Sequence, residues 1–178
     1  MKEIPLTRGY RAIVDDDDYE RLSAKRWRAS VMKPRADGSV TVYAIGSTSL
    51  RDGKERTLFL HRVVLDAPKG KQVDHINGDG LDNRKENLRI CTNAENNRNR
   101  RPYPYGDSKF KGVSWAKRDE KWRATIKMNG KRIHLGYFTR EIDAANAYDA
   151  AAIERFGEFA RTNNARAAFA GELGEVEE

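Results

Sequence analysis

Apolar and polar positions alternate most regularly in the second half of the chain. Along residues 121–128, KWRATIKM, the side chains of Trp122, Ala124 and Ile126 alternate with polar ones, which is the pattern of a half-buried strand. Asn129 and Gly130 follow, and this dipeptide favours a two-residue hairpin turn into a second alternating run, RIHLG. The segment 111–138 therefore predicts three short antiparallel strands with one apolar face and one polar to basic face.

A helix is expected directly after these strands, along residues 140–157. Thr139 can cap its start and Gly157 can end it. Its stripe of mainly small residues, which includes Ala145, Tyr148 and Ala152, would lie on the apolar face of the sheet. The basic face of the sheet would then stay exposed.

The first part of the chain predicts short strands and helices. Residues 4–14 suit a strand pair broken at Gly9, ADGS at 36–39 suits a hairpin turn, and RTLFLHRVVL at 56–65 suits a strand that runs into a helix. The acidic run DDDD at 15–18 could suggest a metal site. A short helix capped by Asp16 or Asp17 explains it better, because acidic side chains favour a helix start.

A strand, a loop, a second strand and a helix are expected between residues 72 and 97. QVDHI and ENLRI suit short strands, and NGDG between them is dense in turn residues. TNAE, at 92–95, is a capping box in which Thr92 begins a helix and Glu95 reaches back to it. Asn96 would lie in the first turns of that helix.

Positive charge is concentrated in one stretch of the chain. The formal net charge is +7, yet residues 98–140 alone hold 13 Lys and Arg against three acidic residues. Tyr and Trp are interleaved with these charges, which favours nucleic-acid binding over a plain solvated surface.

Composition excludes several other classes of protein. No apolar run approaches the length of a membrane span, and MKEIPLTRGY lacks the apolar core of a signal peptide. The single cysteine, Cys91, excludes an intrachain disulfide and a multi-cysteine zinc site. A cytoplasmic location is expected, with no membrane partner, no zinc and no organic cofactor.

The pair Asp74 and His75, followed by many asparagines, suits hydrolysis of a phosphodiester. A neutral imidazole such as that of His75 can take a proton from water near pH 7. Mg²⁺ or Mn²⁺ prefers oxygen ligands, which Asp74 and Asn96 can supply. Asn87 can orient the imidazole without adding negative charge beside a phosphate.

VDHINGDGLDNRKENLRICTNAENN, with His61 and Arg62 upstream, resembles the HNH or His-Me finger motif, in particular that of free-standing HNH homing endonucleases of phages and introns. The resemblance implies that His75 is the general base, that Asp74 and Asn96 bind a divalent metal, and that Asn87 positions the base. Asn96 stands where the motif usually has its last histidine, as in the homing branch.

Two points about this motif stay open at the level of sequence. Adjacent side chains in a regular strand point to opposite faces, so Asp74 and His75 share a site only if the strand is irregular or if they act from different sides. His61 can be a packing or capping residue, and we leave it outside the catalytic set.

Residues 108–163 resemble the APETALA/ethylene-response-factor DNA-binding domain of plants, through KGV, EKW, LGYF and AANAYDAAA. The resemblance implies three strands backed by one helix, with the sheet in the major groove of DNA. Several base-contact positions carry residues other than the plant ones, so DNA binding carries over and the plant sequence preference does not. The positions that it implies are Lys111, Ser114, Ala116, Thr125, Lys127, Arg132 and His134, and side-chain alternation adds Arg123.

These expectations combine into an α+β endonuclease that acts on double-stranded DNA. The predicted parts are a β-rich region at 1–58, a ββα-metal nuclease motif at 59–100, a basic linker at 101–107, a DNA-binding domain at 108–165 and an acidic tail at 166–178. Arg98, Arg100 and Arg101 would contact the DNA backbone. A monomer that nicks one strand is expected, with a dimer left open, as is the target sequence. The alternatives are a non-catalytic DNA-binding regulator and a non-specific toxin-type HNH nuclease.

Overall fold

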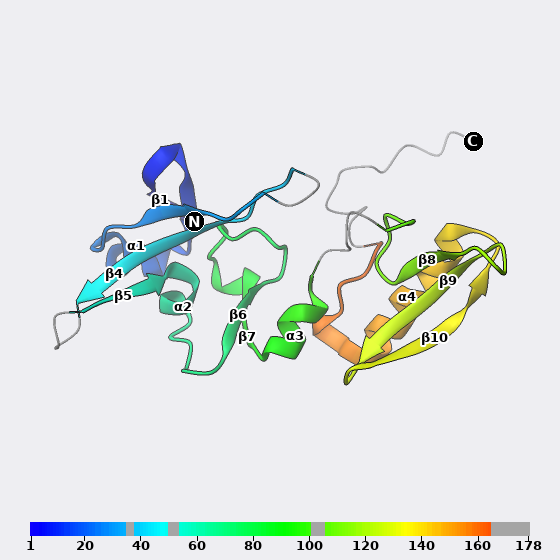
Figure 1. Ribbon diagram of the computed structural model, residues 1–178. Coiled ribbons are helices and arrows are strands. Elements are labelled where there is room, and N and C mark those ends of the chain that lie inside the picture. Colours follow the sequence, from blue (N-terminus) through cyan, green and yellow to red (C-terminus); the bar gives the residue numbers. More distant parts are fainter. Residues whose placement is uncertain (35–37, 50–53, 101–105, 165–178) are drawn as a thin grey trace, which may run out of the picture. The chain divides into compact units, whose positions relative to one another are not determined.

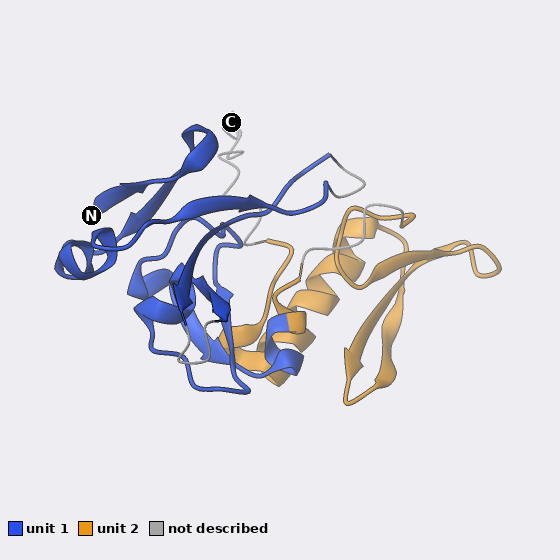
Figure 2. Ribbon diagram, turned by 60° about the vertical axis from the view of Figure 1, so that its left-hand side comes forward, with its two compact units in different colours: residues 1–96 blue, residues 97–178 orange. Residues whose placement is uncertain are grey.

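The computed structural model describes residues 1–34, 38–49, 54–100 and 106–164. The chain forms two compact units, residues 1–96 and residues 97–178 (Figure 2). Arg101, the acidic tail, most of the predicted linker and half of the predicted 36–39 turn lie outside the described residues. The predicted α+β class is confirmed by small antiparallel sheets in the first unit and by a three-stranded sheet with one long helix in the second.

The first unit contains three small antiparallel sheets, with strand orders β1-β2, β3-β4-β5 and β6-β7. Helices α1 and α2 follow β2 and β5, and α3 follows β7 and begins in this unit (Figure 1). The elements are β1 (Lys2–Pro5), η1 (Thr7–Gly9), β2 (Arg11–Val14), α1 (Asp16–Ser23), β3 (Arg28–Val31), β4 (Val42–Ser49), β5 (Glu55–Phe59), α2 (Leu60–Val64), β6 (Gln72–His75), η2 (Lys85–Asn87), β7 (Leu88–Cys91) and α3 (Asn93–Arg98).

One apolar core joins these sheets. Side chains from the first hairpin, α1, the central sheet, α2 and the β6-β7 pair all enter it, so the predicted nuclease motif shares its core with the N-terminal strands. Burial of such side chains is the main stabilising term for a unit of this size. Its buried members include Ile4, Val14, Leu22, Trp27, Val42, Leu60, Val64, Val73 and Leu88.

The second unit is a sheet of order β10-β9-β8 covered on one face by α4 (Figure 1). Its elements are β8 (Val113–Ala116), β9 (Lys121–Met128), β10 (Lys131–Phe138), α4 (Glu141–Phe156) and η3 (Gly157–Phe159). Ala145, Tyr148 and Ala152 are buried under the sheet, as the sequence pattern predicts. Asn129 and Gly130 have positive φ angles of 50° and 78° in the hairpin between β9 and β10.

Gly112 shows how closely α4 approaches the first strand. Its φ is +79°, and a Cβ atom at this position would lie 2.0 Å from Cδ2 of Tyr148 and 2.7 Å from the carbonyl oxygen of Thr125. Only glycine fits both the backbone angle and this contact.

Two helix starts differ from the expectation. The N-cap of α1 is Asp15 rather than Asp16 or Asp17, and its carboxylate accepts a hydrogen bond from the backbone N–H of Lys85 instead of capping the helix. The N-cap of α4 is Arg140 rather than Thr139, and the Arg140 guanidinium pairs with Asp143 in the first turn.

Among the helices of the described residues, none has the length and apolarity needed to cross a membrane.

Candidate active site and nucleic-acid interface

His75 ends β6 and is buried, with 6% of its surface exposed. The ring of His61, from α2, meets it edge-on with the centroids 5.0 Å apart, and the ring of Tyr43, from β4, lies 5.9 Å away. Phe59, the last residue of β5, lies 5.4 Å from His61. These four residues, called here the aromatic cluster, bring rings from β4, β5 and α2 together with the imidazole of His75.

Burial in the aromatic cluster favours the neutral form of both histidines. It lowers the pKa of His75, against the opposing effect of the Asn83 amide and of carboxylates that include Asp74. Burial, with the nearby charges of His75 and Arg62, lowers the pKa of His61 to about 3. Both imidazoles are therefore neutral near pH 7, the state in which a histidine accepts a proton.

The loop after β6 packs directly on the aromatic cluster. A Cβ atom at Gly80 would lie 2.4 Å from the carbonyl oxygen of Val42 and 2.8 Å from the ring of Tyr43. A side chain at this position would push the loop away from β4. The glycine that the sequence pattern assigns to a turn therefore also allows the loop to lie against the ring beside His75.

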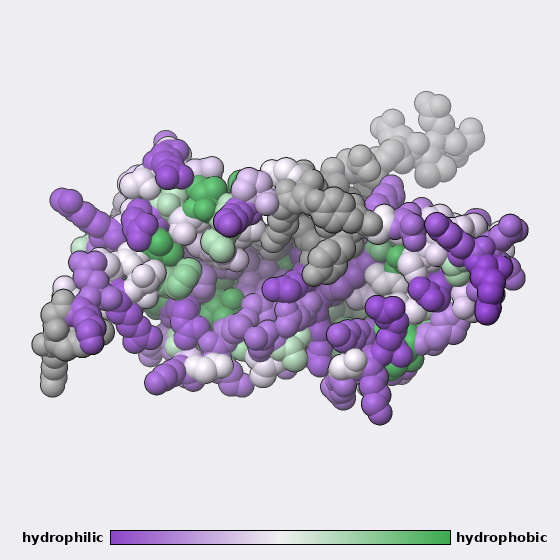
Figure 3. All heavy atoms as spheres, viewed as in Figure 1, coloured by the Kyte–Doolittle hydropathy of each residue, from purple (hydrophilic) through white to green (hydrophobic). Residues whose placement is uncertain are grey.

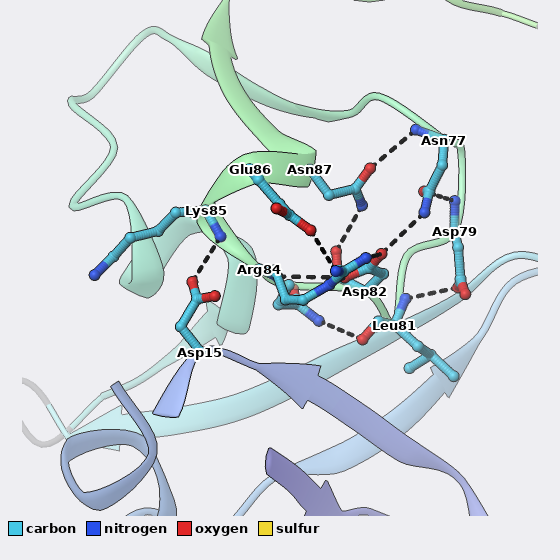
Figure 4. Close-up of polar contacts among 10 residues, drawn as sticks. Asp15, Asn77, Asp79, Leu81, Asp82, Arg84, Lys85, Glu86 and Asn87 are labelled. Atoms are coloured by element: carbon cyan, nitrogen blue, oxygen red, sulfur yellow. Dashed lines mark hydrogen bonds and ion pairs between the residues drawn. The ribbon is translucent and has the colours of Figure 1, made fainter. Parts of the chain in front are cut away.

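The amide of Asn87 holds this loop. Its Oδ1 accepts a hydrogen bond from the backbone N–H of Asn77 at 3.0 Å, and its Nδ2 donates to the carbonyl oxygen of Asp82 at 2.8 Å (Figure 4). The Asp82 carboxylate in turn accepts from Arg84 at 2.8 Å. Both polar atoms of the Asn87 side chain thus bind the loop that covers the cluster.

Asn83, through its amide, opposes the lowering of the His75 pKa by burial. It is 1% exposed, its backbone N–H donates to the carbonyl oxygen of Ile13, and its Nδ2 donates to the carbonyl oxygen of Leu81. Sequence reasoning did not select Asn83, because its neighbours suit an ordinary turn. The sequence indicated a functional region by its many asparagines, but nothing in the position of Asn83 distinguished it from the others.

Asp74 leaves the strand on the face opposite to His75. The pairing of β6 with β7 has no register shift, and it sets Asp74 opposite Arg89 and His75 opposite Leu88. The Arg89 guanidinium donates from Nε and Nη2 to Oδ2 of Asp74, at 3.0 and 2.8 Å; the Asp74 side chain is buried and that of Arg89 is mostly buried. Of the two arrangements that the sequence left open, the structure has the regular strand, with Asp74 and His75 on opposite faces.

Asn96 meets the same face of β6. Its Nδ2 donates a hydrogen bond to Oε1 of Gln72, which precedes Asp74 by two residues and so shares its face. The predicted capping box fixes the start of α3: the Glu95 carboxylate accepts from the backbone N–H of Thr92, and the Thr92 hydroxyl accepts from the N–H of Glu95. The structure thus gathers Asp74 and Asn96 on one side of β6 and His75 on the other.

The second unit presents a polar and basic sheet face. Arg123 donates to the Ser114 hydroxyl at 3.2 Å, and the cross-strand pairs are Thr125 with His134 and Lys127 with Arg132. Hydrophilic side chains dominate the visible surface of this unit (Figure 3). The six predicted DNA-binding residues of the sheet therefore lie together on the face that α4 does not cover. Ala116, the last residue of β8, is partly buried.

Other predicted DNA-binding residues have partners inside the second unit. Lys111 is partly buried, donates to the carbonyl oxygen of Arg98, and has its pKa lowered to about 8 by burial and by Arg161. The Arg98 guanidinium lies over the ring of Phe156, 4.6 Å from its centroid. Arg100 is exposed.

A β-bulge in β10 adds Tyr137 to the polar face. The register shifts between His134 and Gly136, so that Tyr137 lies opposite Arg123. Tyr137 is 43% exposed, and its ring lies 4.6 Å from that of His134. Strict alternation from His134 would have placed Tyr137 on the buried face, so the sequence pattern missed it.

His61 is the second residue that sequence reasoning left aside and the structure brings to the site. It lies on α2, 14 positions before His75, and no local pattern links the two. Its Nδ1 atom is buried and makes no hydrogen bond within the described residues. The pairing with His75 depends on how α2 packs on β6.

Comparisons with known proteins give a different family match for each of two parts of the chain. Residues 59–98 match the family model described as HNH endonuclease, and residues 108–158 match the AP2 domain. The resemblances noted from the sequence are thereby confirmed.

Two curated viral proteins are similar to the chain. Over 65 residues it is 40% identical to "Protein 3.8" of Escherichia phage T7, an alignment that covers 36% of the chain and 54% of that protein. Over 158 residues it is 27% identical to "Uncharacterized HNH endonuclease L560" of Acanthamoeba polyphaga mimivirus, covering 88% of the chain and 76% of that protein. The match to the phage protein thus spans about half of that relative's length.

Proposed function

We propose that this chain, in which an HNH endonuclease domain precedes an AP2 domain, is a metal-dependent endonuclease that hydrolyses phosphodiester bonds in double-stranded DNA. The observation that carries the proposal is the buried imidazole of His75 on the same four-residue strand as Asp74. The name of the mimivirus relative, an HNH endonuclease, supports the same activity.

His75 is the proposed general base. Burial lowers its pKa, so at pH 7 the imidazole is neutral and can accept a proton from the attacking water. The rings of Tyr43 and His61 flank the imidazole, and the loop that Asn87 holds packs against the ring of Tyr43. Asn87 therefore acts on His75 indirectly, by holding that loop.

The side chains on the other face of β6 fit a hard divalent cation. Asp74 offers a carboxylate oxygen and Asn96 an amide oxygen, and Mg²⁺ needs few protein ligands of this kind. These two oxygens are the ligands that the HNH resemblance implies; no cluster of three His, Cys, Asp or Glu side chains able to hold a metal occurs among residues 1–34, 38–49, 54–100 and 106–164. When bound, Mg²⁺ or Mn²⁺ would stabilise the charge on the scissile phosphate and on the leaving 3′ oxygen.

The AP2 domain is the proposed DNA-holding part. Arg123, Lys127 and Arg132 would bind phosphates or base edges, and their positive charge would supply most of the affinity. Ser114, Thr125 and His134 offer hydrogen bonds to base edges in the major groove. Each chain has one His75, so a monomer would nick one strand and a dimer could cut both.

Supercoiled plasmid tests the proposal directly. Wild-type protein with Mg²⁺ should convert it to the nicked circle, whereas the same protein with EDTA, and the His75→Ala variant with Mg²⁺, should leave it supercoiled. If the wild-type protein binds the plasmid and leaves it intact in Mg²⁺ and in Mn²⁺, the chain is a DNA-binding regulator instead.

A further inference from the structure

The hydrogen bond between Asn96 and Gln72 has a direction that matters for a cation. Nδ2 of Asn96 donates, and Oε1 of Gln72 accepts. A side-chain amide carries an oxygen on one side and an NH₂ group on the other, and only the oxygen can bind a cation. When Nδ2 is held at Gln72, Oδ1 is left on the opposite side of the amide.

Gln72 lies on the same face of β6 as Asp74, so it can hold the Asn96 amide beside that carboxylate. Gln72 and Asp74 are two residues apart in a strand with regular pairing, so both side chains leave the same face. Asn96 is in turn fixed at the start of α3, where the capping box of Thr92 and Glu95 limits movement of the helix. The Asn96 side chain can still rotate about its two χ angles, and the bond to Gln72 restricts that rotation.

We propose that Gln72 is a positioning residue of the metal site, which turns the Asn96 amide so that Oδ1 rather than Nδ2 faces the cation beside Asp74. The inference rests on the proposed function, because it needs Asp74 and Asn96 to bind the metal. Gln72 acts through Asn96 and does not bind the metal itself. Groups that orient a metal ligand in this way typically change metal affinity by 10-fold to 100-fold.

The first test compares wild-type protein with Gln72→Met, which keeps the length of the side chain and removes the acceptor. Binding of Mn²⁺ to the full chain is measured by electron paramagnetic resonance, and the Mn²⁺ concentration for half-maximal plasmid nicking is measured separately. Both readouts should show affinity weakened by about 10-fold or more. Gln72→Glu keeps an acceptor for Nδ2 and should bind Mn²⁺ at least as tightly as wild type.

The second test separates positioning from direct ligation. In an Asn96→Asp background both carboxylate oxygens can bind a cation, so the group needs no orientation. Adding Gln72→Met to that background should change Mn²⁺ affinity by less than about two-fold, whereas it changes the wild-type background by about 10-fold. An equal loss in both backgrounds would mean that Gln72 binds the metal directly, and the proposal would be wrong.

Two further outcomes are also decisive. If Gln72→Met binds Mn²⁺ as tightly as wild type, the positioning role of Gln72 is wrong, while the proposed nuclease function is unaffected. If the wild-type chain shows neither Mn²⁺ binding nor metal-dependent nicking, the proposed function fails and the positioning role fails with it. Circular dichroism melts of each variant exclude misfolding, and if Gln72→Met does not fold, Gln72→Lys replaces the acceptor with a donor in the same experiment.

Discussion

The imidazole rings of His61 and His75 meet edge-on, with their centroids 5.0 Å apart and their planes at 87°. The low pKa of His61, about 3, keeps it neutral across the range in which nucleases work. His61 therefore does not compete with His75 for a proton. It packs as an uncharged ring against the imidazole of the proposed base.

Replacing His75 with alanine should abolish cleavage and spare DNA binding. The proposed base lies in the first unit, and the basic sheet face lies in the second. A positioned acid-base group contributes about 10²-fold to 10⁴-fold in rate, and a loss of that size is expected for His75→Ala. Single-turnover nicking at saturating protein measures the rate, and a gel shift in EDTA measures binding. Cleavage within a few-fold of wild type would show that another group is the base.

Acid should destabilise the first unit through its buried histidines. The folded state keeps His61 neutral down to a pKa of about 3, while the unfolded chain protonates it near 6.5. Unfolding therefore takes up a proton in this window, and stability falls as pH decreases from 6.5 toward 3, with a slope of about 1.4 kcal/mol per pH unit.

Urea denaturation between pH 7 and pH 4 measures that slope. His61→Phe keeps a ring in the aromatic cluster and removes the titrating group, so its stability should depend less on pH than that of wild type. Identical slopes for the two proteins would contradict the assignment.

Arg89 should matter for folding as well as for the metal site. Its guanidinium binds the Asp74 carboxylate, and the two side chains are only 11% and 6% exposed. Removing one partner of a buried ion pair typically destabilises a protein by about 3–5 kcal/mol. Arg89→Met should therefore lower the free energy of unfolding by that order. The double variant Arg89→Met with Asp74→Leu should recover part of the loss, which a chemical denaturation series can measure.

Replacing any one of three basic residues on the β10-β9-β8 sheet should make DNA binding less dependent on salt. Arg123, Lys127 and Arg132 lie on the sheet face that α4 does not cover. When a variant neutralises one phosphate fewer, the slope of log K against log salt becomes shallower by about one. Lys127→Ala, measured by fluorescence anisotropy between 50 and 200 mM salt as an approximate range, tests this. Lys111→Ala is the matched comparison, because that side chain donates to the carbonyl oxygen of Arg98. It should reduce thermal stability more than it changes the salt slope.

Tyr137 should affect which DNA the chain prefers. The β-bulge exposes its ring beside His134 on the polar face, where an aromatic ring can pack against a thymine methyl group or a sugar. Tyr137→Ala should therefore bind a randomised duplex pool with a weaker preference after selection, while the salt slope stays that of wild type. An unchanged selected sequence would exclude a role in base reading.

Local signals in the sequence predicted much of this structure. The Thr92 and Glu95 capping box, the Asn129 and Gly130 turn and the small-residue stripe of α4 all depend on neighbours within a few residues. Such features are encoded where they occur, because their hydrogen bonds and packing contacts close over short distances.

The features that could not be predicted depend on distant contacts. His61 reaches His75 only through the packing of α2, and the bulge at Gly136 shifts the alternation of β10 by one residue. The acidic run at 15–18 shows the same limit, because Asp15 binds the N–H of Lys85, 70 residues away. Residue type could indicate an acceptor there, but not which donor it would meet.

The first hairpin has a consequence for the order of folding. The backbone of Ile13 accepts from Asn83 and donates to Leu81, both at 2.8 Å, and Lys85 binds Asp15 and Asp18 of the same region. The loop after β6 is thus held by residues that precede it by about 70 positions in the chain. During synthesis this hairpin emerges first, and contacts of such sequence separation form slowly. The loop after β6 therefore completes late, on a hairpin that is already in place, and a fragment that begins at residue 59 would lack that hairpin.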